Sequence, residues 1–392
     1  MQRIKLLLVF GTRPEAIKMA PVVHALKQEP CFEVRVCVTG QHRQMLDQVL
    51  TWFNIVPDYD LNIMSANQSL TQLHHKIMHG LESVFADFKP HRILVHGDTA
   101  TTFAASLAAF YHKIAIAHVE AGLRTKSLEA PWPEEANRRL TTVLADLHFA
   151  PTDWAKDNLL RAQVPPNTVY VTGNTVIDAL FSTLVTIKAS LVPQLQVQLS
   201  CVSNAKQQQR KILLVTGHRR ENHGQGILDL CQALLHLVQH YPVTVVYPVH
   251  LSPQVNQPVR ELLSNNASIH LLDPLDYVPF VYLMQQSDII LTDSGGIQEE
   301  APSLGKPVLV MRETTERPEG VAAGVVRLVG TQTQSIINAV SELLNQNTLQ
   351  QQMSQAANPY GDGQAAQCIV TILKQSYGIA NTQLLAECAL AI

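Results

Sequence analysis

Short apolar runs alternate with longer stretches of helical periodicity along most of the chain. Such alternation is typical of βαβ units, in which a helix returns the chain to the next parallel strand. The apolar runs are nearly continuous, as expected of strands that helices cover on both faces. In the first half, the pattern predicts strands at residues 4–10, 34–38, 92–96, 114–119 and 147–150.

The alternation stops at residues 186–211 and then begins again. This Gln-rich interval lacks regular turn signals, which indicates an exposed connection or an irregular helix. A length of 392 residues suits two domains. We therefore predict an α/β protein with two Rossmann-like doubly wound domains and a ligand site in the interdomain cleft. The second domain has expected strands at residues 212–217, 243–249, 268–272, 289–293, 307–311 and 325–330.

Polar motifs lie directly after the expected strands rather than before them. In parallel sheets the carboxyl ends of the strands share one edge, where ligands bind. Random polar clusters would fall equally often at both ends of the strands, so their shared placement predicts a functional site. The motifs are GTRPE, TGQH, HGDTATT, HVEAGLRT, TGHRREN and TDSGGIQEE.

Two of these motifs have features of anion sites at helix starts. In the first domain, Pro14 fits the first turn of a helix, and Arg13 and Lys18 lie near its positive end. Surface cations at an ordinary helix start are the alternative. The absence of GxGxxG and P-loop motifs disfavours NAD and ATP, so two anion sites suggest a nucleotide diphosphate. In the second domain the expected anion contacts are Ser294, Gly295, Gly296 and Arg317, with Glu300 as a ribose ligand or a solvated helix residue.

Three carboxylates, Asp98, Glu120 and Glu134, belong to loops of the first domain. Carboxylates that share a closed site repel one another and lose solvent, which raises their pKa toward values useful for proton transfer. Each could instead cap a helix or pair with a cation. His218, after the first strand of the second domain, could stabilise a leaving phosphate or carry a proton. No histidine or cysteine spacing indicates a metal site, and we expect no metal.

Composition narrows the class of partner. Apolar residues make up 46% of the chain and charged residues 16%, and the net charge is −3. This balance disfavours a nucleic-acid or membrane-surface binder and favours a small partner. The six cysteines form no CxxC pair, and no run of about 18 apolar residues is present. The N-terminal apolar run leads into GTRPE rather than a cleavage site, so we expect a cytoplasmic protein.

The motifs together resemble those of the bacterial non-hydrolysing UDP-N-acetylglucosamine 2-epimerases. The resemblance also includes PWPEEANRR and GNTVIDAL, and runs in order from about residue 4 to about residue 330. It implies a GT-B fold with UDP bound mainly by the second domain. The implied divisions are an N-terminal domain at 1–172, a C-terminal domain at 173–368 and a helix at 369–392 that packs back on the first domain.

The resemblance implies reversible conversion of UDP-N-acetylglucosamine to UDP-N-acetylmannosamine. In this family, UDP is eliminated to give 2-acetamidoglucal and is then added back, without a cofactor. The matching positions imply that Asp98, Glu120 and Glu134 handle the C2 proton and hold the sugar, with His218 near the diphosphate. Which carboxylate removes the proton stays open. The remaining implied substrate contacts are Arg13, Lys18, Phe280, Ser294, Gly295, Gly296, Glu300 and Arg317.

Further implications concern regulation and assembly. The resemblance implies a homodimer, a role in cell-envelope polysaccharide synthesis, and a possible second UDP-N-acetylglucosamine that acts as activator near Gln41, His42 and Gln44. The activator site matches only in part, because Asn67 stands where some activated members have arginine. Leu275 likewise replaces a polar residue beside the uracil, so a contact there would use the backbone.

Three other functions stay open at this stage. A GT-B glycosyltransferase would share the fold and the UDP site, but it needs an acceptor pocket and has no use for three carboxylates around C2. A hydrolysing 2-epimerase would share the motifs and release free N-acetylmannosamine and UDP. A nucleotide-sugar sensor would bind without reacting and would not need to retain acid and base groups. Decoration of the sugar at C3 or C6 is also undetermined.

Overall fold

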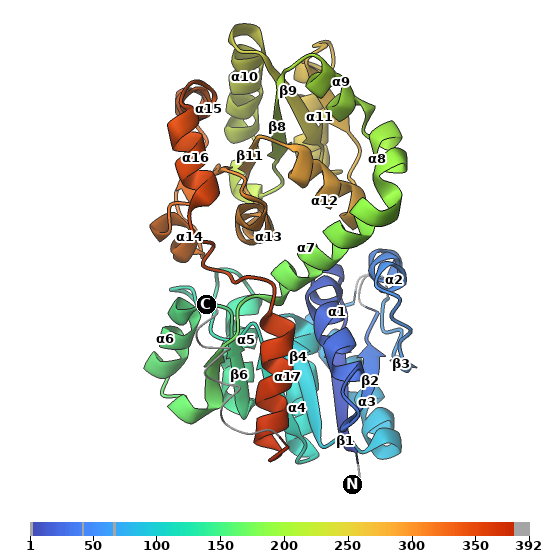
Figure 1. Cartoon of the computed structure of the whole chain (residues 1–392). Coiled ribbons are helices and arrows are strands. Elements are labelled where there is room, and N and C mark those ends of the chain that lie inside the picture. Colours follow the sequence, from blue (N-terminus) through green and yellow to red (C-terminus); the bar gives the residue numbers. More distant parts are fainter. Residues whose placement is uncertain (1–2, 41–42, 66–67, 380–392) are drawn as a thin grey trace. The chain divides into compact units, whose positions relative to one another are not determined.

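The computed structural model describes residues 3–40, 43–65 and 68–379 (Figure 1). It forms two compact units: unit 1 comprises the described residues up to Ala179 and from Tyr360 onward, and unit 2 is Leu180–Pro359. The chain therefore changes units after residues 179 and 359, whereas the resemblance implied divisions after 172 and 368.

Unit 1 is built on a seven-stranded parallel sheet with strand order β3-β2-β1-β4-β5-β6-β7. Five strands correspond to those predicted from the apolar runs, while β3 and β7 were not predicted. The strands are β1 (Ile4–Phe10), β2 (Phe32–Val38), β3 (Tyr59–Asp60), β4 (Arg92–His96), β5 (Ala115–Val119), β6 (Leu147–Ala150) and β7 (Val169–Val171).

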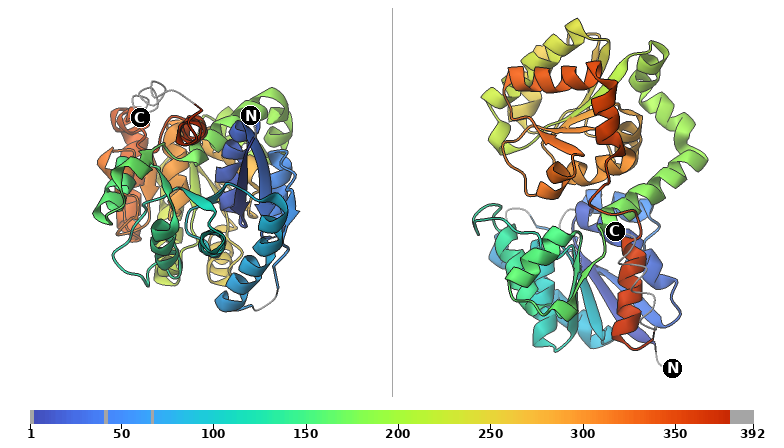
Figure 2. Two further views of the ribbon diagram at one scale, coloured as in Figure 1. Left: turned by 90° about the horizontal axis from the view of Figure 1, so that it is seen from below. Right: turned by 60° about the vertical axis from the view of Figure 1, so that its left-hand side comes forward.

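Helices follow the strands of unit 1 in sequence. The helices α3 and α4 cover one face of the sheet, where their apolar side chains pack on Leu7, Val9, Ile93 and Val95. Helix α17 (Ala365–Ser376), the last one within the described residues, packs beside α1, as Figure 2 also shows. The other helices that begin in this unit are α1 (Arg13–Lys27), α2 (Arg43–Trp52), α3 (Leu70–Phe88), α4 (Ala100–Tyr111), α5 (Glu134–Leu144), α6 (Asp153–Arg161) and α7 (Thr175–Thr186).

Unit 2 is built on a six-stranded parallel sheet with strand order β10-β9-β8-β11-β12-β13. Alternate residues of the central strand β8 point to opposite faces: Leu213 and Val215 pack in one core cluster, and Ile212 and Leu214 in the other. All six strands correspond to predicted ones: β8 (Lys211–Thr216), β9 (Val243–Pro248), β10 (Ile269–Leu272), β11 (Ile289–Thr292), β12 (Val308–Val310) and β13 (Val326–Leu328).

The two faces of this sheet carry different helices. Helices α10, α11, α15 and α16 contribute to one core cluster, and α8, α9 and α12 contribute to the other. The bounds of the helices in unit 2 are α8 (Val192–Gln198), α9 (Ser200–Gln207), α10 (Gln225–His240), α11 (Pro253–Leu263), α12 (Tyr277–Gln286), α13 (Gly295–Glu300), α14 (Pro318–Ala322), α15 (Thr333–Asn345) and α16 (Asn347–Gln355).

Residues 186–211 are largely helical rather than an exposed connection. Helix α7 continues through a π-helical turn (Ile187–Leu191) into α8, and α9 follows. The combined segment Thr175–Gln198 is long and apolar enough to span a membrane by length and composition alone. Its Leu180, Ile187 and Leu195 are buried in the core of unit 2. These contacts account for its apolar character as part of a globular core.

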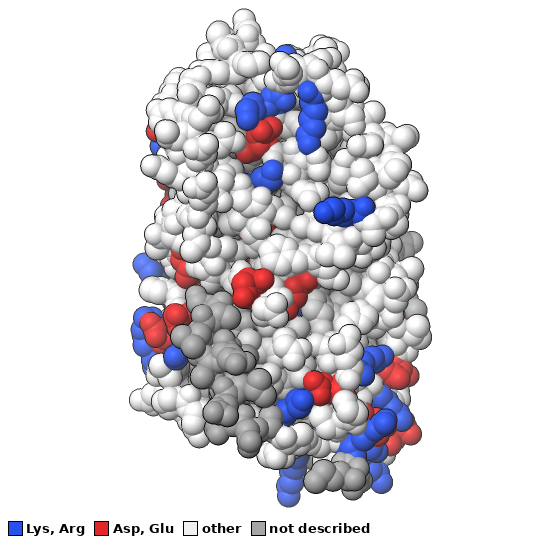
Figure 3. All heavy atoms as spheres, viewed as in Figure 1, with Lys and Arg blue, Asp and Glu red and all other residues white. Residues whose placement is uncertain are grey.

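The surface agrees with the modest charge of the sequence. On the face drawn in Figure 3, Lys and Arg side chains lie in scattered groups rather than in a continuous basic patch.

Among the described cysteines, Cys37, Cys201, Cys231 and Cys368 are buried. Burial raises the pKa of the Cys37 thiol to about 12, which makes it a poor nucleophile at neutral pH.

Candidate active site

The turn after β1 is fixed by a buried carboxylate. Helix α1 begins after Thr12, whose side chain accepts a hydrogen bond from the backbone of Glu15. In return, Glu15 accepts from the backbone N–H groups of Gly11 (3.0 Å) and Thr12 (2.8 Å), a capping box. Its other oxygen accepts from the Thr99 hydroxyl at 2.7 Å. Glu15 therefore ties the loop that bears Arg13 to the loop that bears Asp98.

Glu120 lies immediately after β5 and is buried among three polar groups. Its carboxylate pairs with the Lys18 ammonium, lies 3.5 Å from His96 Nε2 and accepts from Asn174 Nδ2 at 3.2 Å. Burial raises the pKa of Glu120, but Lys18 and His96 outweigh this effect and hold it well below its usual range. Glu120 is therefore ionised at neutral pH.

A second group surrounds Asp98, which follows β4. Arg138 on α5 donates to the Asp98 carboxylate from Nε (3.0 Å) and Nη2, and Asn137 donates to the Asp98 carbonyl at 2.9 Å. The cap of α4 is Thr99, so Asp98 is not the helix cap that its position before TATT allowed. Asp98 is instead an ion-pair partner of Arg138, as the second alternative allowed, and this pairing orients its carboxylate.

The two adjacent acids at the start of α5 differ sharply. Glu135 is fully buried and accepts from the Thr125 backbone (3.0 Å), from Arg138 (3.0 Å) and from Arg139 (2.6 Å). Glu134 is half-buried and has no side-chain hydrogen bond or ion pair to another residue within the described part of the chain. Glu135 is therefore held by buried donors, whereas the Glu134 carboxylate is not.

In unit 2, parallel register brings His218 and Asp293 together. Thr216 at the end of β8 pairs with Thr292 at the end of β11, so the residues that follow these strands are neighbours. His218 Nδ1 lies 3.1 Å from Asp293 Oδ1, and the buried carboxylate also accepts from the backbone N–H groups of His218 and Arg219 at 2.9 Å. Burial raises the pKa of Asp293, but the hydrogen bond from His218 and the backbone donors outweigh it and lower the pKa overall.

The second motif of unit 2 places a guanidinium against a glycine. A Cβ atom on Gly295 would lie 2.6 Å from Arg317 Nη1, so only glycine allows this approach. Arg317 also donates to Glu299 at 2.5 Å and lies 3.0 Å from Glu316. Burial raises the pKa of Glu316, but Arg317, Arg312 and Arg219 outweigh it and lower the pKa to about 2. The expected ring and ribose contacts, Phe280 and Glu300, are both half-buried.

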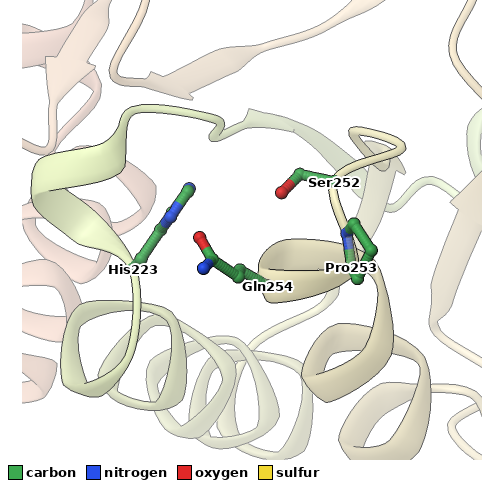
Figure 4. A pocket seen from close by; sticks show the side chains of 4 residues that line it. All are labelled: His223, Ser252, Pro253 and Gln254. Atoms are coloured by element: carbon green, nitrogen blue, oxygen red, sulfur yellow. The ribbon is translucent and has the colours of Figure 1, made fainter.

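Unit 2 contains a pocket whose lining residues were not predicted as site residues. It is linked to His218 through His250. It has a volume of about 590 Å³ and is lined by His223, Ser252, Pro253 and Gln254 (Figure 4). His250 connects the two places, because its ring stacks on His218 at 5.7 Å and its Nδ1 accepts from the Ser252 N–H at 3.1 Å.

The predicted site residues thus fall into groups within each unit. Within the described residues, no cluster of three or more His, Cys, Asp or Glu side chains could hold a metal ion. Of the residues expected at an activator site, Gln41 and His42 lie outside the described residues, as does Asn67. Gln44 belongs to α2, and its side chain is not described.

Comparison with known proteins identifies the family. A family profile described as UDP-N-acetylglucosamine 2-epimerase matches residues 24–374. The chain belongs to the UDP-N-acetylglucosamine 2-epimerase family. Its members are isomerases, and the two Rossmann-like units agree with the GT-B-like architecture of the family.

Relatives in this family match the chain over nearly its whole length. The 2-epimerase of Yersinia pestis is 58% identical over 372 residues, which cover 95% of this chain and 98% of the relative. The 2-epimerase of Escherichia coli is 55% identical over 374 residues, which cover 95% of this chain and 99% of the relative. The solved structure of the Neisseria meningitidis UDP-GlcNAc 2-epimerase, bound to UDP-GlcNAc, matches with a TM-score of 0.88 at 54% identity. The match covers 95% of this chain and 100% of the solved chain.

Several residues of these groups were not predicted as site residues from the sequence. They are His96, Glu135, Arg138, Asn174, Asp293 and Glu299, together with Asn222, whose Nδ2 donates to Asp293 at 3.0 Å. Asp293 carries the same signal as the predicted residues, because it is a polar residue directly after a strand. Arg138 carries no such signal because it lies within a helix, and Asn174 follows strand β7, which the apolar pattern did not predict.

Proposed function

We propose that the chain interconverts UDP-N-acetylglucosamine and UDP-N-acetylmannosamine by reversible inversion at C2 of the sugar. The support for the substrate is the likeness over 95% of the chain to the neisserial epimerase that was solved with UDP-GlcNAc. The support for the chemistry is the set of three carboxylates, Asp98, Glu120 and Glu134, each in a different electrostatic setting. The C2 proton is weakly acidic because no carbonyl is adjacent, so simple deprotonation is unfavourable.

Elimination avoids that difficulty. A base takes the C2 proton while the C1–O bond to UDP breaks, which leaves 2-acetamidoglucal with a C1–C2 double bond. Addition of UDP to C1 and of a proton to the opposite face of C2 gives the epimer. No atom is oxidised or reduced overall, so this route needs no redox cofactor.

The surroundings of the carboxylates suggest how they divide the work. The Glu134 carboxylate is half-buried and has no hydrogen bond or ion pair among the described residues, so we assign it the exchange of the C2 proton. Glu120 is held ionised by Lys18 and His96 and is better suited to orienting the sugar. Asp98, oriented by Arg138, is the second candidate for proton transfer.

The diphosphate and the nucleoside would be held mainly by unit 2. The Ser294 backbone N–H donates to the Thr292 hydroxyl, so Gly295 and Gly296 would offer backbone N–H groups, Ser294 its hydroxyl and Arg317 its guanidinium to phosphate oxygens. The proposed uracil and ribose contacts are Phe280 and Glu300. His218 would act on the leaving phosphate, and Arg13 and Lys18 would contribute positive charge from unit 1. A cytoplasmic homodimer with an activator site near Gln41, His42 and Gln44 remains part of the proposal.

Product analysis from both directions tests this function. Purified protein is incubated with UDP-N-acetylglucosamine, and separately with UDP-N-acetylmannosamine, without added metal or NAD. We expect both reactions to converge on one mixture of the two nucleotide sugars, with no accumulation of UDP. Accumulation of UDP with free N-acetylmannosamine would establish a hydrolysing enzyme instead, and absence of either product would reject the function.

A further inference from the structure

Asn174, in the GNTVIDAL motif, has no role in the function proposed so far. It is 2% exposed and lies directly before α7. Its backbone N–H donates to the Tyr360 carbonyl at 2.8 Å, and its Oδ1 accepts from the Val176 N–H at 3.1 Å. The backbone and one end of the side chain are therefore fixed by local contacts.

The backbone around Asn174 leaves little room for adjustment. Gly173 has a φ of +80° and Gly361 a φ of +110°, and a Cβ atom on Gly361 would lie 3.2 Å from the Gly173 Cα. Each of these two closely packed segments has a conformation that favours glycine, so the position of Asn174, which directly follows Gly173, is restricted. The backbone of Asn174 is therefore held in one position, and with it the side-chain amide.

That amide points at the Glu120 carboxylate. Nδ2 donates at 3.2 Å to Oε2, the same oxygen that pairs with Lys18 and lies 3.5 Å from His96. Lys18 reaches it from α1, His96 from β4 and Asn174 from the segment before α7. Glu120 also has a φ of +60°, which is uncommon for a residue with a side chain and requires support from its surroundings.

We propose that Asn174 is a positioning residue for the epimerisation, which fixes the orientation of the Glu120 carboxylate toward the sugar. This inference rests on the proposed function. Lys18 and His96 attract the carboxylate by charge, whereas the amide adds a directional hydrogen bond from a rigid segment. Loss of the amide would leave Glu120 buried and paired but less well oriented, and would weaken the stabilisation of its ionised form.

Substitutions at Asn174 separate this role from helix capping. Serine and aspartate both cap helices well, but neither donates to Glu120 as the amide does, and aspartate adds a like charge. We expect Asn174→Ser and Asn174→Asp to lower kcat by about 10- to 100-fold with KM changed less than about threefold. The acid limb of the kcat/KM profile should move to higher pH, further for Asp than for Ser. Thermal unfolding should change little in Asn174→Ser, whereas the added buried charge of Asn174→Asp also lowers stability.

A purely structural role predicts another pattern. The Ser and Asp variants would then match the wild type in kcat and pH profile, and Asn174→Ala would lose stability while Asn174→Ser would not. Thr152→Ala, which removes the cap of α6 in the same unit, is the matched control and should lower stability while leaving the pH profile unchanged. Normal kcat in both the Ser and Asp variants overturns the inference alone, whereas a wild type without epimerase activity overturns the proposed function as well.

Discussion

At the scale of single residues, the site contains acids with similar sequence context and different physical environments. Glu134 and Glu135 are adjacent in the chain, yet one is half-buried and the other receives donors from the Thr125 backbone, Arg138 and Arg139. The sequence predicts that this region contributes a carboxylate. It does not predict which of the two acids is buried, nor that Arg138 also pairs with Asp98, which lies 40 residues away in the sequence.

This difference predicts opposite effects of two neighbouring substitutions. Glu134→Gln should retain the fold and UDP affinity and lower turnover by about 10²-fold or more, because it removes a proton-transfer group. Glu135→Gln should instead lower the free energy of unfolding by about 3–5 kcal/mol, because it disturbs a buried ion-pair network. Turnover and urea denaturation of both variants check this. Near-normal turnover in Glu134→Gln would remove Glu134 from the mechanism.

In unit 2, the buried Asp293 beside His218 is expected to affect turnover. Its carboxylate lies 3.1 Å from His218 Nδ1, where it can hold the ring in place and favour a proton on Nδ1. Asp293→Asn should lower kcat/KM by about 10²-fold, within the range for acid–base groups. Asp273→Asn, which removes an exposed ion pair with Arg260, is the control and should have no measurable effect. Equal kinetics of the two variants would show that the pair with His218 is not used.

At the scale of elements, the apolar runs were sufficient to predict the strands that carry the loops of the site. The unpredicted strands β3 and β7 have only two and three residues, too few for a pattern to stand out. Residues 186–211 were expected to be an exposed connection or an irregular helix, and the second alternative is confirmed, because their apolar side chains pack as helices on the core of unit 2. Tertiary packing of this kind is not visible in local sequence.

A buried acid holds the last helix to unit 1. Asp178 on α7 accepts from the backbone N–H groups of Ala365 (3.3 Å) and Ala366 (2.8 Å) at the start of α17. Burial raises the pKa of Asp178 from 3.8 to about 6, although the backbone donors oppose the shift. The folded chain therefore binds this proton more tightly than the unfolded chain, and stability falls as the pH rises from about 4 to about 6.

This linkage gives a prediction for the Asp178→Asn variant, which keeps an acceptor for α17 but cannot ionise. Between pH 4 and pH 7, the wild type should lose about 3 kcal/mol of unfolding free energy relative to the variant. Urea denaturation at several pH values measures the difference, with exposed Asp157→Asn on α6 as the control. Parallel profiles for wild type and Asp178→Asn would contradict a raised pKa at this position.

At the scale of the whole molecule, the chain enters unit 2 after Ala179 and returns to unit 1 at Tyr360. The resemblance to a family implied a returning C-terminal helix. The pattern of apolar residues alone did not, because α17 resembles any other amphipathic helix. The segments around Gly173 and Gly361 are nearly 190 residues apart in sequence and pack directly on each other. Only the folded chain shows that this contact supports Glu120 through Asn174.

We propose that carboxylates of unit 1 exchange the C2 proton of a UDP-sugar with solvent. Proton NMR of the wild type with UDP-N-acetylglucosamine in deuterated water tests it most directly. We predict that deuterium appears at C2 in UDP-N-acetylmannosamine from the first turnover, and in recovered UDP-N-acetylglucosamine as the reaction reverses. Formation of UDP-N-acetylmannosamine that retains its original C2 proton would contradict proton exchange with solvent at that carbon.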